Sequence, residues 1–165
     1  MKKKNIVLTG IMGCGKSTVG CMLASCLGMA FLDLDQYIEK KWGRIPDLFL
    51  KGEEYFRDIE SAAVEEISDN ENTVIATGGG TVKKDKNIAA LKKSGIIFFI
   101  DRPIDDILKD VEISERPLLS GGKEKLIEIF RERYHRYIVT CDYHIKDARY
   151  LKTVVNEIIT IYKNA

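Results

Sequence analysis

The stretch Gly10-Ile-Met-Gly-Cys-Gly-Lys16-Ser17-Thr18 matches the pattern G-x-x-x-x-G-K-[ST] and lies between a short apolar run and a helical pattern. Glycines let such a loop turn its backbone N–H groups around a phosphate, and the following helix N-terminus adds partial positive charge. Lys16 would reach the β- and γ-phosphates, and Ser17 would ligate Mg²⁺. We therefore predict that a nucleoside triphosphate binds to Gly13, Cys14, Gly15, Lys16, Ser17 and Thr18.

Five short apolar runs have strand character, and helical patterns fill the gaps between them. Several of these runs are continuous rather than alternating, which is typical of parallel strands covered on both faces. The sequence therefore predicts an α/β protein of the P-loop NTPase fold, in which a five-stranded parallel sheet lies between two helix layers. The predicted strands are residues 5–9, 31–33, 73–77, 96–101 and 143–146.

Composition and length favour a single domain, 1–165, that acts on small molecules. The chain has 165 residues, is 45% hydrophobic and 31% charged, and carries a formal charge of +1. A nearly neutral chain gives little support for a nucleic-acid or membrane partner. We expect a cytoplasmic protein, because no apolar run approaches the roughly 18 residues of a membrane span and the run after MKKKN is too short for a signal peptide. We also expect a monomer. The four cysteines form no C-x-x-C pair and are predicted to be reduced thiols.

Two aspartates follow the second predicted strand. Asp33 lies where a carboxylate can reach Mg²⁺ directly or through water. Asp35 has two interpretations: a catalytic carboxylate beside the metal, or the N-cap of the helix that follows. Asp101, at the end of the run GIIFFID, is a second metal candidate, although any buried strand of a parallel sheet can resemble this pattern.

One arginine and a run of three glycines are candidates for a site that binds a second substrate. Arg57 and Glu60 are neighbours on the predicted helix 53–68, where they form either a surface ion pair or a unit in which Glu60 orients Arg57 toward a substrate carboxylate. Gly78, Gly79 and Gly80 follow the third predicted strand. They form either a simple turn or a backbone segment that a ligand approaches closely.

Three further side chains are of types that react as nucleophiles or bind metals. Cys14 is either a small residue that fills a variable loop position or a reactive thiol, since it lies near a helix N-terminus. Alkylation of such a thiol would block nucleotide binding. We interpret His135 and His144 as surface residues, because two isolated histidines do not form a metal site.

Taken together, the segments GIMGCGKST, FLDLD, IPDLFLKGEEYFRDIE, VIATGGG and ERPLL resemble the shikimate kinase family, which are small P-loop kinases of the nucleoside-monophosphate-kinase type. The resemblance extends from about residue 5 to about residue 140. Many enzymes share the phosphate loop, whereas Asp33-x-Asp35 combined with GExxFRxxE and TGGG is more discriminating.

The resemblance implies transfer of the γ-phosphoryl group of ATP to the 3-hydroxyl of shikimate, with Mg²⁺ as cofactor, in chorismate and aromatic amino-acid biosynthesis. It also implies a mobile lid at about 111–123 and a substrate-binding helical region at about 35–62. The implied catalytic residues are Lys16, Asp35 and Arg116, and the metal ligands are Ser17 and Asp33. Lys109 and Arg116 would join the phosphate loop in binding ATP, and shikimate would contact Asp35, Arg57, Glu60, Gly78, Gly79, Gly80 and Arg133.

Two of these residues have alternatives. Lys109 stands where family members often carry an arginine that packs on the adenine, and lysine stacks less well. Arg131 and Arg136 lie close enough to Arg133 to compete for its role.

Two other functions are alternatives. A gluconate or nucleoside-monophosphate kinase is the first rival function, disfavoured by the combination of Asp35, Arg57 and the glycine run. The second is a regulatory ATPase or GTPase, although the chain has no N-K-x-D guanine motif.

Overall fold

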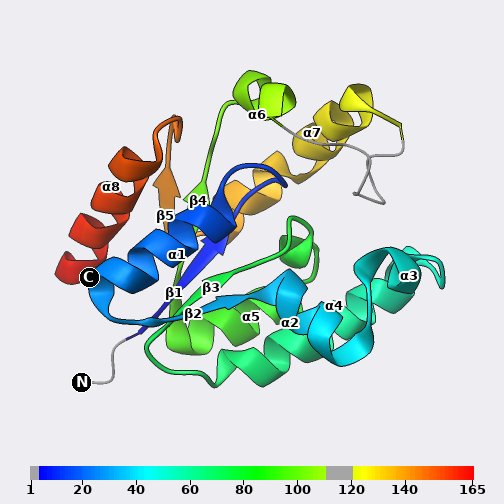
Figure 1. The fold of residues 1–165 in the computed structure, drawn as a ribbon, viewed down its shortest axis with the longest axis horizontal. Helices are drawn as coiled ribbons and strands as arrows, with labels where there is room; N and C mark the ends of the chain where they lie inside the picture. The colour runs from blue at the N-terminus through cyan, green and yellow to red at the C-terminus, as the bar shows by residue number, and fades with distance from the viewer. Residues whose placement is uncertain (1–3, 111–120) are drawn as a thin grey trace.

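The computed structural model describes residues 4–110 and 121–165. A parallel sheet of five strands in the order β2-β3-β1-β4-β5 forms its centre (Figure 1). This arrangement confirms the α/β fold and the five-stranded parallel sheet predicted from the sequence. The strands are β1 (Asn5–Thr9), β2 (Ala30–Asp33), β3 (Thr73–Ala76), β4 (Gly95–Ile100) and β5 (Tyr143–Ile145).

Helices on both faces complete three layers. α1 and α8 lie against one face of the sheet, while α5 and α7 contact β4 from the other (Figure 1). The short helix α3, which we did not expect as a separate element, has Pro46 in its first turn, where a fixed φ suits a helix start. The helices are α1 (Lys16–Leu27), α2 (Leu34–Trp42), α3 (Ile45–Phe49), α4 (Glu53–Ser68), the 3₁₀ turn η1 (Thr81–Lys83), α5 (Asp85–Ser94), α6 (Ile104–Asp110), α7 (Lys123–Thr140) and α8 (Leu151–Asn164).

Burial explains why the sequence signal for the strands was a continuous apolar run. Every residue of β1, β3 and β4 is buried, because helices cover both faces of these interior strands. The edge strands β2 and β5 are partly exposed. On β4 the ring of Phe99 stacks on Tyr137, with ring centroids 5.1 Å apart, and this contact fixes α7 against the sheet.

Because all five strands are parallel, their carboxyl ends meet at one edge of the sheet, where ligands bind in folds of this kind. The phosphate loop follows β1 at this edge, Asp33 ends β2, and the glycine run follows β3. Within the predicted lid, residues 111–120 lie outside the described residues, and Lys123 is the first residue of α7. Among the described residues, 4–110 and 121–165, no helix is long and apolar enough to cross a membrane.

Candidate functional site

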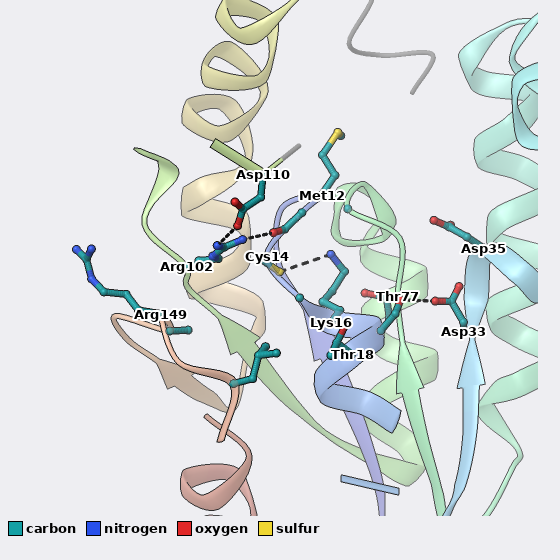
Figure 2. A pocket seen from close by; sticks show the side chains of 16 residues that line it. Met12, Cys14, Lys16, Thr18, Asp33, Asp35, Thr77, Arg102, Asp110 and Arg149 are labelled. Atoms are coloured by element: carbon teal, nitrogen blue, oxygen red, sulfur yellow. Dashed lines mark hydrogen bonds and ion pairs between the residues drawn. The ribbon is translucent and has the colours of Figure 1, made fainter. Parts of the chain in front are cut away.

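A cavity of about 520 Å³ lies at the carboxyl edge of the sheet, a volume suited to a small-molecule ligand. Figure 2 shows Lys16 between two groups of side chains, with Asp33 and Asp35 on one side and Arg102, Asp110 and Arg149 on the other. The cavity therefore lies at the carboxyl ends of all five strands, since Thr77 and Gly79 after β3 also line it. Of the predicted site residues, Gly13, Cys14, Gly15, Lys16, Ser17, Thr18, Asp33, Asp35 and Gly79 line it.

The phosphate loop is shaped for an anion. Gly10, Gly13 and Gly15 have φ values of 149°, 83° and 99°, which L side chains rarely adopt. Gly15 caps α1 without a side-chain hydrogen bond, so the first N–H groups of the helix are available to a phosphate. Lys16 is only 8% exposed, and its Nζ donates to the carbonyl oxygens of Gly10 (2.7 Å) and Ile11 (3.1 Å). Its ammonium group thus lies inside the loop that a phosphate would occupy.

Asp33 links the phosphate loop to α2. The Ser17 hydroxyl donates to Asp33 Oδ2, and Asp33 Oδ1 accepts a hydrogen bond from the backbone N–H of Gln36 at 3.1 Å. Asp33 is therefore the N-cap of α2, and the interpretation of Asp35 as that cap is wrong. The chain becomes helical at Leu34, which leaves Asp33 as the extended residue and places Asp35 in the first turn.

The oxygens of Ser17 and Asp33 converge at one point, and hard oxygen donors of this kind fit Mg²⁺. In the described ranges no group of three or more His, Cys, Asp or Glu side chains could hold a metal ion. A magnesium ion at Ser17 and Asp33 would accordingly take its other ligands from phosphate oxygens and water, as this ion commonly does.

The three glycines after β3 are required for space rather than for an unusual backbone angle, since none of them has a positive φ. A Cβ added to Gly78 would lie 3.0 Å from both Asp35 Oδ1 and Glu60 Oε2. One added to Gly79 would lie 3.2 Å from the backbone nitrogen of Met12, and one added to Gly80 would lie 2.3 Å from Arg57 Nη2. The glycine run therefore brings the phosphate loop, Asp35 and Arg57 together.

Arg57 and Glu60 are 3% and 1% exposed, so the interpretation of the pair as a surface ion pair is wrong. Arg57 Nη1 donates to Glu60 Oε1 at 2.9 Å, while Glu60 Oε2 accepts from the Thr81 hydroxyl at 3.0 Å. Glu53 contacts the other side of the guanidinium at 3.4 Å. Burial alone would raise the pKa of Glu53, but its contacts with Lys83 and Arg57 lower that pKa overall. Two carboxylates thus fix the plane of Arg57.

Arg133 is buried on α7 with 3% exposure. Its Nε and Nη1 atoms have no hydrogen-bond partner among the residues that the structure describes. Gly79 is its neighbour, because a Cβ there would lie 3.6 Å from Arg133 Nη1. By contrast, Arg131 is exposed, and Arg136 donates to the carbonyl oxygen of Val82 and pairs with Asp85. Of the three candidate arginines, only Arg133 combines burial with unpaired donors directed at the glycine run.

Several predicted site residues do not line the cavity. Lys109 is 75% exposed and lies 3.7 Å from Asp106 in its own helix, while Arg116 lies outside the described residues. The residues predicted to bind the phosphoryl acceptor also lie outside the cavity lining, and the contacts of the glycine run link them to it. They are Arg57, Glu60, Arg133, Gly78 and Gly80.

Sequence reasoning missed Arg102, Asp110 and Arg149, which line the cavity opposite Asp33 (Figure 2). Arg102 and Arg149 come shortly after β4 and β5. The rule that ligands bind beyond the carboxyl ends of parallel strands could have identified both positions.

Asp101 does not face the metal position. Its Oδ2 accepts hydrogen bonds from the Tyr134 hydroxyl (2.6 Å) and from His144 Nε2 (2.7 Å). The bond to Asp101 raises the pKa of Tyr134 to about 12. His144 is partly exposed, at 20%, on the edge strand β5, and its ring also stacks on Phe99. Asp101 thus joins β4 to β5 and α7.

Cys14 is 2% exposed, and its sulfur lies 3.7 Å from Lys16 Nζ inside the loop. We expect alkylation of Cys14 by iodoacetamide to be on the order of tenfold slower than that of Cys21 and Cys26, because those two thiols are exposed on the same chain. Mass spectrometry of a labelling time course would measure the three rates together. Equally fast labelling of Cys14 would instead support the reactive-thiol interpretation.

A parallel sheet of this strand order, with a phosphate loop after its central strand and paired aspartates after β2, defines a P-loop kinase. The family model described as shikimate kinase matches residues 12–163. The shikimate kinase of Clostridium botulinum strain Eklund 17B / Type B is 47% identical over 163 residues, which cover 98% of this chain and 99% of that protein. The chain belongs to the shikimate kinase family and is an ATP-dependent phosphotransferase.

Solved structures agree with this assignment. The shikimate kinase from Acinetobacter baumannii in complex with shikimate has a TM-score of 0.89 and 34% identity, and the match covers 98% of this chain and 93% of that one. The shikimate kinase from Aquifex aeolicus vf5 has a TM-score of 0.83 and 36% identity, with 96% of each chain covered.

Proposed function

We propose that the chain transfers the γ-phosphoryl group of ATP to the 3-hydroxyl of shikimate, and that two groups of residues divide this work. Residues 13–18, with Asp33, hold the nucleotide. Asp35 aligns the hydroxyl that attacks, and Arg57 and Arg133 bind the carboxylate of the acceptor. Gly78, Gly79 and Gly80 line the acceptor site, and Glu60 steadies Arg57.

The observation that carries this proposal is the buried guanidinium of Arg133, whose Nε and Nη1 atoms have no hydrogen-bond partner among the described residues. Buried donors without a partner are costly, and a carboxylate is the ligand that best matches the planar fork of an arginine. Arg57, already held by Glu53 and Glu60, has a fixed orientation at the neighbouring Gly80. A small hydroxylated carboxylate suits two such arginines better than a neutral sugar or a nucleotide base would.

Positioning and charge neutralisation govern the reaction, because phosphoryl transfer passes through a loose transition state with little need for a strong base. Lys16 would leave the carbonyls of Gly10 and Ile11 and donate to the β- and γ-phosphates. A magnesium ion held by Ser17 and Asp33 would neutralise phosphate charge. Asp35 would orient the acceptor hydroxyl and take its proton late in the transfer. Arg116 in the lid would add positive charge at the transferring group, and closure of the lid would exclude water.

The function is tested by an ADP-release assay that compares shikimate, gluconate and nucleoside monophosphates as acceptors, with identification of the product by NMR. We expect turnover with shikimate and a phosphate on its 3-hydroxyl. Turnover with another acceptor only would favour a related small-molecule kinase. ADP release without any acceptor would favour a regulatory NTPase.

We expect Arg57→Lys to raise the KM for shikimate about tenfold or more, because lysine cannot provide the two-nitrogen contact to a carboxylate. The KM for ATP should change less than about twofold. Steady-state kinetics with either substrate varied would measure both effects, and Arg131→Lys on the exposed face of α7 is the matched control. An unchanged KM for shikimate would remove Arg57 from the acceptor site.

A further inference from the structure

Arg102 connects the phosphate loop to α6. It follows β4, and its side chain is 20% exposed. Arg102 Nη1 donates to the carbonyl oxygen of Gly13 at 3.1 Å, and its Nη2 atom pairs with Asp110 Oδ2 (Figure 2). The two contacts use different nitrogens of one planar group, so the guanidinium holds the loop and the last residue of α6 at the same time.

The contact with Gly13 differs from the other side-chain contacts of the loop. Among the hydrogen bonds between described residues, Arg102 is the one side chain from another part of the chain that donates to the backbone of residues 10–15. The other side chain that donates to this backbone among the described residues, Lys16, belongs to the loop motif itself. Lys16 must give up its bonds to Gly10 and Ile11 when its ammonium group turns to a phosphate. The bond from Arg102 does not have to break at that step.

A hydrogen bond to Gly13 restricts a part of the loop whose backbone is free to change conformation. The Gly13 φ of 83° is a conformation that an unrestrained glycine leaves easily, because glycine has the widest choice of backbone angles. The N–H groups around it stabilise a triphosphate only when they already point toward the phosphates. A hydrogen bond that fixes the Gly13 carbonyl therefore reduces the ordering that nucleotide binding would otherwise require.

We propose that Arg102 is a positioning residue for nucleotide binding: it holds the phosphate loop through the Gly13 carbonyl while Lys16 moves to the phosphates. The proposal deepens the nucleotide half of the proposed function and rests on it. Lys109, which stands where family members often carry an adenine-packing arginine, takes no part in this anchor, because its exposed ammonium group lies beside Asp106 on α6. The guanidinium groups at this wall of the cavity belong to Arg102 and Arg149, and of these two Arg102 donates to the loop.

The test measures the dissociation constant of MgADP by calorimetry, together with the KM values for ATP and shikimate. Arg102→Ala should raise the MgADP dissociation constant about tenfold or more, as expected for the loss of one charged hydrogen bond, and leave the KM for shikimate within about twofold. Arg102→Lys should fall between wild type and Arg102→Ala. Asp110→Asn should change the MgADP dissociation constant less than about threefold, because the bond to Gly13 remains.

Lys152→Gln is the charge-matched control. Lys152 is an exposed lysine beside the cavity residue Leu151, and among the described residues it forms no hydrogen bond or ion pair with the loop. An unchanged affinity in Arg102→Ala would overturn the proposal, as would an equal loss in Asp110→Asn or Lys152→Gln. Thermal melting checks that each variant is folded, and Arg102→Lys decides the question if Arg102→Ala does not fold. MgADP binding needs no acceptor, so failure to phosphorylate shikimate would count against the proposed function and leave this measurement valid.

Discussion

Asp35→Asn is expected to lower kcat by on the order of 10²- to 10⁴-fold while leaving nucleotide affinity nearly intact. The amide has almost the same shape as the carboxylate, but it neither accepts the proton of the acceptor hydroxyl nor carries the charge that aligns it. Asp35 lies in the first turn of α2, beside Gly78 and at the wall of the cavity opposite Arg102. Single-turnover kinetics with shikimate and a MgADP titration would measure the two quantities.

Asp33→Asn is the complementary change, and we expect it to weaken nucleotide binding in the presence of Mg²⁺ more than in its absence. Asp33 bonds to Ser17 and caps α2, so the variant should also lose some stability. Asp105→Asn is a matched control, because Asp105 is an exposed aspartate in the first turn of α6. Equal effects of Asp33→Asn and Asp35→Asn on both quantities would contradict the division of labour between them.

Gly80→Ala is expected to raise the KM for shikimate by about one to two orders of magnitude, a loss of about 1.5–3 kcal/mol for one charged contact. The new methyl group would lie within 2.5 Å of three atoms of the Arg57 guanidinium. The φ of Gly80 is −102°, which alanine adopts without strain, so the effect would come from displacement of Arg57 alone. Steady-state kinetics would show the increase, and the KM for ATP should remain close to that of wild type.

Gly28→Ala serves as the control for this substitution. Gly28 ends α1 with a φ of 62°, and no atom lies within 4 Å of its added Cβ. This change should lower stability by about 1 kcal/mol through backbone strain alone and alter neither KM. If Gly80→Ala lowered the melting temperature but left the KM for shikimate unchanged, Arg57 would not contact the acceptor.

The sequence located the nucleotide half of the site more completely than the acceptor half. Residues 10–18 are contiguous, and the motif specifies both the glycines and the lysine, so local chemistry is enough to recognise it. Arg57 and Arg133 lie in α4 and α7, far apart in the chain, and only the resemblance to a family pointed to both. Arg102 carries no motif, and its contact with Gly13 spans 89 positions of sequence.

By itself, the sequence determined the fold class, the phosphate loop and the order of the strands along the chain, because apolar runs, glycines and helix ends are local signals. The tertiary structure decided which side chains are buried and which atoms meet. In the structure Asp33, not Asp35, caps α2, and the Arg57–Glu60 pair is buried. Asp101 accepts hydrogen bonds from Tyr134 and His144. These outcomes depend on how strands and helices pack, and spacing along the chain does not contain that information.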